Sequence, residues 1–308
     1  MASTPLFETL TVVADSDGVA KAATIIASGG CVAVPTETVY GLAADATNGE
    51  AVAGIYAAKG RPSFNPLIVH VADFAAAERL AEFSDVAFAL AQKHWPGPLT
   101  LVLPLRAGAP IASLVTAGLS TIAIRVPDHP VMQAMLAACG CPLAAPSANA
   151  SGGISPTKAQ HVERSLGGRI PMILDGGATG HGLESTIVAV REDGLLEVLR
   201  LGPIDLGLGL TTAGLIEAPG QLLHHYAPSK PIRINATSAA PHEWMIGFGP
   251  INGNDSLSET GDLTEAAARL FDCLHKADQS AQTAIAVAPI PTDGIGAAIN
   301  DRLHRAAA

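Results

Sequence analysis

The chain has 308 residues, of which 48% are hydrophobic and 15% are charged, and its formal net charge is -10. The length predicts one large domain and a smaller second one, because single cores rarely grow beyond ~250 residues. The acidic balance argues against strong direct binding to tRNA or duplexes, which needs a basic face. The N-terminal stretch is acidic instead of basic, and no uncharged apolar run reaches the ~20 residues that span a bilayer. We therefore expect a cytoplasmic protein that does not enter membranes.

Short apolar runs alternate with helical patterns in the first two thirds of the chain, which predicts an α/β sheet with helices packed against it. A helix is expected at 18–28, and a second runs from a cap at Asn48 through Ala58. The predicted strands are 31–35, 67–71, 99–104, 121–127, 142–148, 170–174, 185–190 and 195–201. Polar motifs follow the ends of these runs, where α/β sheets place their ligands.

A change of composition follows residue 202, where glycine and proline recur without a clear period. We divide the chain into a first domain at 1–206, a linker at 207–229 and a small C-terminal domain at 230–308. In the last part, strands are predicted at 231–235, 243–248 and 283–289, and a helix at 263–277. Asp262 and Glu265 resemble a capping box at the beginning of that helix. The order indicates a small Rossmann-like α/β domain.

The segment KGRPSFNPLIVH at 59–70 is the first candidate for an active site. Lys59 and Arg61 stand two residues apart on a proline-stiffened loop that runs through Asn65 into a strand ending at His70. Alone, His70 would more often be a core histidine, but its position after these cations favours a functional role.

Two further cations end apolar strands, Arg125 in TIAIRVP and Arg200 in LLEVLRL. A buried guanidinium needs an anionic partner, since burying it unpaired is costly. That partner is either a carboxylate of the protein or a carboxylate or phosphate of a substrate. Cations without a paired acid and base are typical of sites that stabilise phosphoryl or adenylyl transfer.

The common nucleotide signatures are missing, since the sequence has neither a P-loop nor a Gly-x-Gly-x-x-Gly motif. The glycine-rich segment at 175–186 is either a flexible turn or a loop whose backbone approaches phosphates. Ser147 lacks the flanking glycines of a nucleophile elbow. Ser147 and Asn149 point to the same side of an extended segment, which suits hydrogen bonding to a ligand.

These motifs, taken together, resemble the threonylcarbamoyl-AMP synthase family, which has the YrdC-like fold. The resemblance covers roughly residues 10 to 205 and rests on PTETVYGL (35–42), KGRPSFNPLIVH (59–70), WPGPLTLVL (95–103), IAIRVPDHP (122–130), APSANASG (145–152), ESTIV (184–188) and LRLGPI (199–204). HHYAP at 224–228 and the end of the chain resemble the longer, two-domain members. The implied fold is a twisted open mixed sheet with flanking helices, followed by a small α/β domain.

The resemblance implies that L-threonine, bicarbonate or carbon dioxide, and ATP with Mg²⁺ react to give threonylcarbamoyl-AMP and pyrophosphate. The product would pass to proteins that transfer threonylcarbamoyl to the tRNA adenosine beside the anticodon. The family's threonine-binding positions correspond to Thr38, His70, Arg125, Ala145 (through its backbone) and Ser185. Its ATP-binding positions correspond to Arg61, Asn65, Thr121, Ser147, Ser155, Arg200 and Tyr226, with Lys59 and Asn149 beside the phosphates and Lys59 and Arg61 expected to be catalytic.

Three alternatives remain open at this point. An RNA-binding module of the same fold would lack adenylation activity, and the net charge speaks against it. A carbamoyl-transfer domain of the kind used in hydrogenase maturation would carry acylphosphatase-like and zinc-containing parts. An inactive relative would have lost motifs that are intact here.

Overall fold

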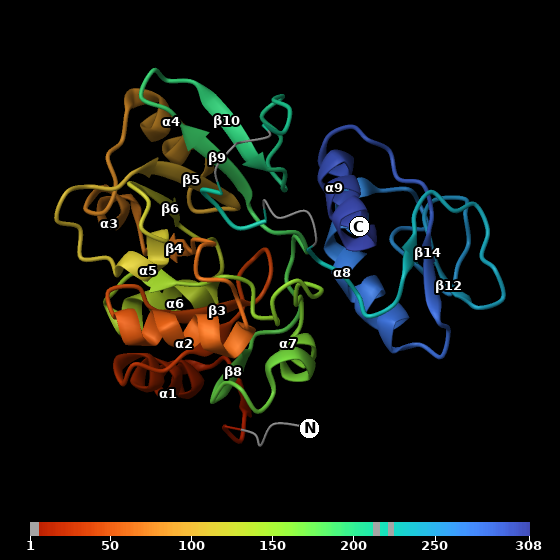
Figure 1. The fold of residues 1–308 in the computed structure, drawn as a ribbon, viewed down its shortest axis with the longest axis horizontal. Helices are drawn as coiled ribbons and strands as arrows, with labels where there is room; N and C mark the ends of the chain where they lie inside the picture. Colours follow the sequence, from red (N-terminus) through yellow and green to blue (C-terminus); the bar gives the residue numbers. More distant parts are fainter. Residues whose placement is uncertain (1–5, 212–215, 221–224) are drawn as a thin grey trace.

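The structure, a computed structural model, describes residues 6–211, 216–220 and 225–308. A large body formed by the first part of the chain and a small one formed by the last part stand side by side (Figure 1). Between them runs the segment that the sequence predicts to be a linker, of which 212–215 and 221–224 lie outside the described residues.

The large body is built on a ten-stranded mixed sheet, as the family resemblance implies. In spatial order its strands are β1 (Leu10–Val13), β8 (Met172–Asp175), β2 (Val32–Val34), β3 (Gly41–Asp45), β7 (Leu143–Ala144), β4 (Ile68–His70), β6 (Thr121–Arg125), β5 (Leu99–Pro104), β9 (Thr186–Val190) and β10 (Leu196–Arg200). All eight predicted strands are present, although 142–148 shortens to two residues. The edge strand β1 and the central strand β3 were not predicted.

Helices cover the sheet of the large body (Figure 1). They are α1 (Ser16–Ala27), α2 (Gly49–Lys59), α3 (Phe74–Glu78), α4 (Asp85–His94), α5 (Ser113–Thr116), α6 (Pro130–Cys139) and α7 (Ala159–Leu166). The predicted cap of α2 is confirmed, because the Asn48 side chain accepts hydrogen bonds from the amides of Glu50 and Ala51. The helix ends at Gly60, whose φ of 60° is left-handed, and this turn directs the chain from Lys59 to Arg61.

The small body has a parallel four-stranded sheet with the order β11-β14-β12-β13. Its elements are β11 (Ile232–Arg233), β12 (Glu243–Gly247), β13 (Asp255–Ser256), α8 (Leu263–Gln279), β14 (Ala284–Val287) and α9 (Ile295–Ala307). The Asp262 side chain caps α8 by accepting from the Glu265 amide. The reciprocal half of the predicted capping box is wrong, because the Glu265 carboxylate accepts from Ser258 instead.

Helices α8 and α9 lie between the small sheet and the large body (Figure 1). The apolar core of the small body includes Val39, Ile154 and Leu183 of the large one, so the two share buried surface. Polar contacts add to it: Lys158 Nζ lies 2.7 Å from Asp272 of α8. The C-terminal body is therefore packed directly behind the segments that carry the candidate site.

Candidate active site

A small cavity of about 40 Å³ lies where the ends of several strands of the large sheet meet the linker. It is lined by Thr36, Thr38, Val39, Gly41, Arg61, Ile68, His70, Arg125, Ala145, Pro146, Ser147, Glu184, Ser185, Arg200, Pro219, Gly220, His225 and Tyr226. Nine of the residues named from the sequence are in this set, although they come from seven separated segments of the chain. The cavity is the candidate active site.

Three buried cations on one side of the cavity have no carboxylate partner among the described residues. Arg61 donates to the carbonyl oxygens of Asn65 (3.2 Å) and Pro66 (3.0 Å). Arg200 donates to the carbonyl and the hydroxyl of Ser185, at 3.0 and 2.9 Å. Both guanidiniums thus face neutral acceptors only, and a buried cation in this state favours an anionic ligand.

Lys59 is the third of these cations and lies behind the cavity wall. Its Nζ donates to the carbonyl oxygens of Ser147 (2.6 Å) and Asn149 (2.5 Å). Burial, and next the charge of Arg61, hold the pKa of Lys59 well below its usual range. Lys59 therefore fixes the backbone of the Ser147–Asn149 loop against the cation side.

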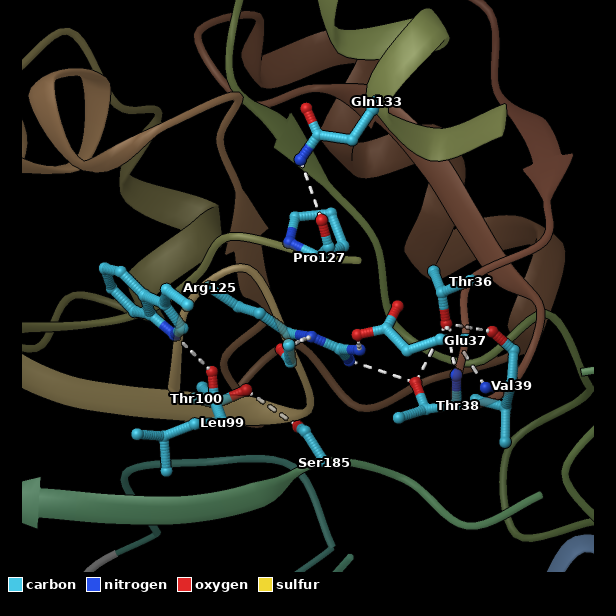
Figure 2. Close-up of polar contacts among 12 residues, drawn as sticks. Thr36, Glu37, Thr38, Val39, Leu99, Thr100, Arg125, Pro127, Gln133 and Ser185 are labelled. Atoms are coloured by element: carbon cyan, nitrogen blue, oxygen red, sulfur yellow. Dashed lines mark hydrogen bonds and ion pairs between the residues drawn. The ribbon is translucent and has the colours of Figure 1, made fainter. Parts of the chain in front are cut away.

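Arg125 differs, because a protein carboxylate already pairs with it (Figure 2). Its guanidinium contacts the Glu37 carboxylate and donates to the Thr38 hydroxyl (3.0 Å) and the Gly97 carbonyl (3.1 Å). Burial would raise the pKa of Glu37, but Arg125 lowers it below its ordinary value. The sequence leaves two possible partners for Arg125, a carboxylate of the protein or an anion of a substrate. In the structure the partner is a carboxylate of the protein, Glu37.

Several buried polar atoms at or near the cavity form no hydrogen bond with the residues that the structure describes. They are Asn65 Oδ1, His70 Nδ1, Asn149 Oδ1, His225 Nδ1 and the Tyr226 hydroxyl. Burial, and next the charge of Arg125, lower the pKa of His70 to about 3, so its imidazole is neutral at physiological pH. Since buried polar groups normally have partners, this concentration indicates atoms that a ligand satisfies.

The remaining residues named from the sequence lie around the cavity or away from it. Ser155 is buried behind it and its hydroxyl donates to Glu184. Thr121 does not line the cavity: it stands at the beginning of β6, opposite Pro104, whereas Arg125 ends that strand. Four residues of extended strand separate the two by roughly 13 Å.

The linker contributes a residue in an unusual backbone conformation. Tyr226 is fully buried with φ 65°, a left-handed value that is rare for a bulky residue. Its ring stacks on Phe271 of α8 at 5.7 Å, and the Arg302 guanidinium lies 5.0 Å from its centre. Gly220 lies against Tyr226, since an added Cβ would be 2.9 Å from the hydroxyl. The described part of the linker thus closes the cavity.

Sequence reasoning missed two carboxylates that belong to this site, Glu37 and Glu184. Both stand in the quoted motifs PTETVYGL and ESTIV, directly beside residues that were selected. An acid within an otherwise apolar segment was the available signal. It also missed Gly220 and His225, which line the cavity from the linker.

The fold and site define a class of protein, an α/β enzyme with a closed, cation-rich site made for a small anionic substrate or for phosphates. Comparison with known proteins identifies the family. A Sua5/YciO/YrdC family model described as "Telomere recombination" matches residues 24–202, and the model "Threonylcarbamoyl-AMP synthase, C-terminal domain" matches 194–308. The chain belongs to the threonylcarbamoyl-AMP synthase family.

Individual relatives agree with this assignment. Threonylcarbamoyl-AMP synthase of Bacillus subtilis is 40% identical, over 94% of this chain and 92% of the relative. The crystal structure of Pyrococcus abyssi Sua5 complexed with L-threonine superposes with a TM-score of 0.87 and 34% identity, covering 98% of this chain and 97% of that one. Escherichia coli YciO, at 21% identity and a TM-score of 0.56, shares the fold of 65% of the chain.

Two other features are absent from the described part of the chain. No helix there has the length and apolar character needed to cross a membrane. No group of three or more His, Cys, Asp or Glu side chains is placed to hold a metal ion among the same residues.

Proposed function

We propose that this protein is a threonylcarbamoyl-AMP synthase that uses L-threonine, bicarbonate or carbon dioxide, and ATP, and releases pyrophosphate. Family membership and the activity named for its relatives support the proposal. The observation in this chain that carries it is a single cavity lined by two sets of residues, which we assign to the two substrates. Arg61 and Arg200, cations without carboxylate partners among the described residues, form one set, and His70 and Arg125 form the other.

Threonine is assigned to the side of Arg125 and His70. The hydroxyls of Thr38 and Ser185 and the backbone at Ala145 complete that side. A threonine carboxylate that reaches Arg125 must share the guanidinium with Glu37, which already neutralises it. Neutral His70 leaves its Nδ1 free to hydrogen-bond the amino acid. The relative solved with L-threonine supports this substrate.

ATP is assigned to the side of Arg61 and Arg200, and these two guanidiniums would bind phosphate oxygens as charge-assisted donors. Asn65, Ser147, Asn149, Ser155 and Tyr226 are assigned to the nucleotide by the family resemblance, and Thr121 is assigned to the part of ATP that extends away from the cavity. The unpartnered atoms of Asn65, Asn149 and Tyr226 support this assignment.

The reaction requires little general-base machinery. The neutral threonine amine forms a bond to the carbon of CO₂ and loses one proton, which gives a carbamate. A carbamate oxygen then attacks the α-phosphorus, and the bond from that phosphorus to the bridging oxygen of pyrophosphate breaks. Arg61 and Arg200 hold the anions together, and Lys59 fixes the backbone of Ser147 and Asn149 behind them, so positioning and electrostatic stabilisation supply the acceleration.

Magnesium enters the proposal together with ATP. A nucleotide-bound Mg²⁺ takes most of its ligands from phosphates and water and neutralises part of the triphosphate charge. Glu184, a carboxylate that lines the cavity, is already paired with Arg302, which fits an ion held by phosphates and water. No protein side chain is assigned to the ion.

The substrates require the linker to move. At about 40 Å³ the cavity is far smaller than the ~300–1,000 Å³ of ordinary ligand pockets, so it does not hold threonine and ATP as it stands. Gly220, His225 and Tyr226 must therefore leave their positions before threonine and ATP enter, and they then cover the nucleotide and exclude water. The product would pass to proteins that modify tRNA in the cytoplasm.

Pyrophosphate release, measured with threonine and bicarbonate omitted in turn, tests the function. We expect release only when both are present with Mg·ATP, and the adenylate should be detectable by mass spectrometry. Release that is independent of threonine would overturn the assignment. Salt-sensitive tRNA binding without ATP turnover would instead support the RNA-binding alternative.

A further inference from the structure

Arg302 is the largest fully buried side chain of the described chain, and it comes from the last helix, α9. It is 0% exposed, and its three nitrogens reach three different segments. Nε donates to Glu184 at 2.9 Å, Nη2 to the Leu201 carbonyl at 2.8 Å, and Nη1 to Asp301 at 2.7 Å. The C-terminal body thus inserts a charged side chain behind Glu184, which lines the cavity.

The main partner of Arg302 belongs to the cavity wall. Glu184 lines the cavity, and its other oxygen accepts from the Ser155 hydroxyl. Burial would raise the pKa of Glu184, but the charges of Arg302 and then Arg200 lower it. An ionised carboxylate in this place repels phosphates unless a cation neutralises it.

Without Arg302, the cation that still lowers the pKa of Glu184 is Arg200. Arg200 forms no ion pair with the described residues and is the cation assigned to ATP phosphates. If Arg200 had to compensate Glu184, its charge would no longer be available to the nucleotide. Arg302 therefore keeps Arg200 free for phosphate.

Arg302 also contacts the linker. Its guanidinium lies 5.0 Å from the ring centre of Tyr226, within the distance of a cation–π interaction. Tyr226 keeps a left-handed φ of 65°, a conformation that persists only where surrounding contacts enforce it. One side chain of α9 consequently holds both the Glu184 carboxylate and the tyrosine that covers the cavity.

We propose that Arg302 is a positioning residue by which the C-terminal domain prepares the ATP side of the active site. It neutralises Glu184, so that Arg200 faces phosphate, and it seats Tyr226 over the nucleotide. This inference rests on the proposed function and assigns the C-terminal domain a part in that function.

The test compares Arg302→Met with Arg269→Met in the full-length protein. Arg269 is the control for loss of an arginine ion pair: it contacts Asp255 at 2.8 Å inside the C-terminal body, is 41% exposed and does not line the cavity. We expect Arg302→Met to raise the KM for ATP about tenfold or more, in the range of ordinary couplings between sites, and to change the KM for threonine much less. Arg269→Met should leave the KM for ATP and the KM for threonine unchanged. Equal effects of the two substitutions on both KM values would overturn the inference.

A second comparison separates charge compensation from structural support. Glu184→Gln introduced into Arg302→Met removes the uncompensated carboxylate and should recover most of the lost ATP affinity. If this second substitution does not improve the KM for ATP, Arg302 has only a structural role.

If Arg302→Met does not fold, Arg302→Lys replaces it in the measurement of the KM for ATP. Lysine retains the charge beside Glu184 but cannot reach Leu201 and Asp301 together, so we expect a lower melting temperature with nearly unchanged KM for ATP. A lysine variant with strongly raised KM for ATP contradicts the proposal. Wild-type protein that shows no threonine-dependent pyrophosphate release contradicts the proposed function itself, which keeps the two failures distinguishable.

Discussion

Replacing Arg125 with alanine should damage stability and threonine binding separately, because this arginine has a structural partner as well as the proposed ligand. Its guanidinium pairs with Glu37 and donates to Thr38 (Figure 2), and its Nε donates to the Gly97 carbonyl. Both side chains of the ion pair are nearly buried, at 3% and 11% exposure. The substitution leaves Glu37 as a buried carboxylate without its cation.

The expected loss of stability follows from the unpaired charge of Glu37. Removing one partner of a buried ion pair costs about 3–5 kcal/mol, and this figure includes the hydrogen bonds that hold the pair. We therefore expect the free energy of unfolding to fall by about 4 kcal/mol. At about 2–4 °C per kcal/mol for domains near 200 residues, the melting temperature should fall by roughly 8–16 °C. Adding Glu37→Gln should recover about half of this loss, because no buried charge then remains.

Thermal unfolding followed by circular dichroism, and the KM for threonine at a temperature where all variants are folded, provide the measurements. The KM for threonine should rise in Arg125→Ala and stay high in Glu37→Gln/Arg125→Ala. A double variant with a normal KM for threonine would show that Arg125 acts only by compensating Glu37, and it would refute the assignment to the threonine carboxylate. An unchanged melting temperature of Arg125→Ala would refute the stability reasoning.

The pH dependence gives an independent check on the same pair. In the wild type, the lowered pKa of Glu37 contributes stability that is present above its unfolded value of 4.5 and is lost as the pH falls through the folded pKa. In Arg125→Ala, burial still raises the pKa of Glu37 and only backbone hydrogen bonds oppose it, so this pKa is higher than in the wild type. The stability difference between the two proteins should therefore narrow between about pH 7 and about pH 4. A constant difference would exclude Glu37 as the source.

Three further outcomes are expected. Arg61→Ala should abolish pyrophosphate release with a melting temperature close to the wild type, because Arg61 binds only carbonyls of its own loop; a large loss of stability would contradict this. Gly220→Ala should raise the KM for ATP at least about tenfold, since its φ is 89° and a Cβ would meet Arg200 and Tyr226 at 2.9 Å; an unchanged KM would mean that the linker does not cover ATP. Ending the chain before Gly220 should leave a folded first domain with weakened ATP binding in calorimetry, and unchanged affinity and turnover would refute the lid.

Local sequence patterns predicted the strands that end at the site. The run ending at His70 and the run ending at Arg125 are apolar, β-branched and bounded by loops, and both form parallel neighbours in the sheet. The central strand β3 was missed because GLAAD has no β-branched or aromatic residue, and its pairing with β2 and β7 overrides that weak propensity. Tertiary context, not local preference, makes this segment a strand.

The cations of the site were identified from sequence, but their partners were not. Each cation ends or precedes an apolar strand, which is a local signal. In the sequence, Glu37 lies 88 positions from its partner Arg125, and Glu184 lies 118 positions from its partner Arg302. No spacing rule relates residues so far apart, because only the folded sheet and the docking of α9 bring them together. The role of the C-terminal domain was therefore invisible before the structure.

The charges of these buried side chains fit the proposed chemistry. Two of the buried arginines, Arg125 and Arg302, are each neutralised by a buried glutamate. Arg61 and Arg200 then remain as a surplus of two positive charges, even when Lys59 is neutral. A protein with a net charge of -10 thus keeps a local positive site, which Mg·ATP, with about two negative charges, can enter without leaving either side uncompensated. The same surplus makes the empty site unfavourable, so ATP binding should stabilise the folded chain more than threonine binding does.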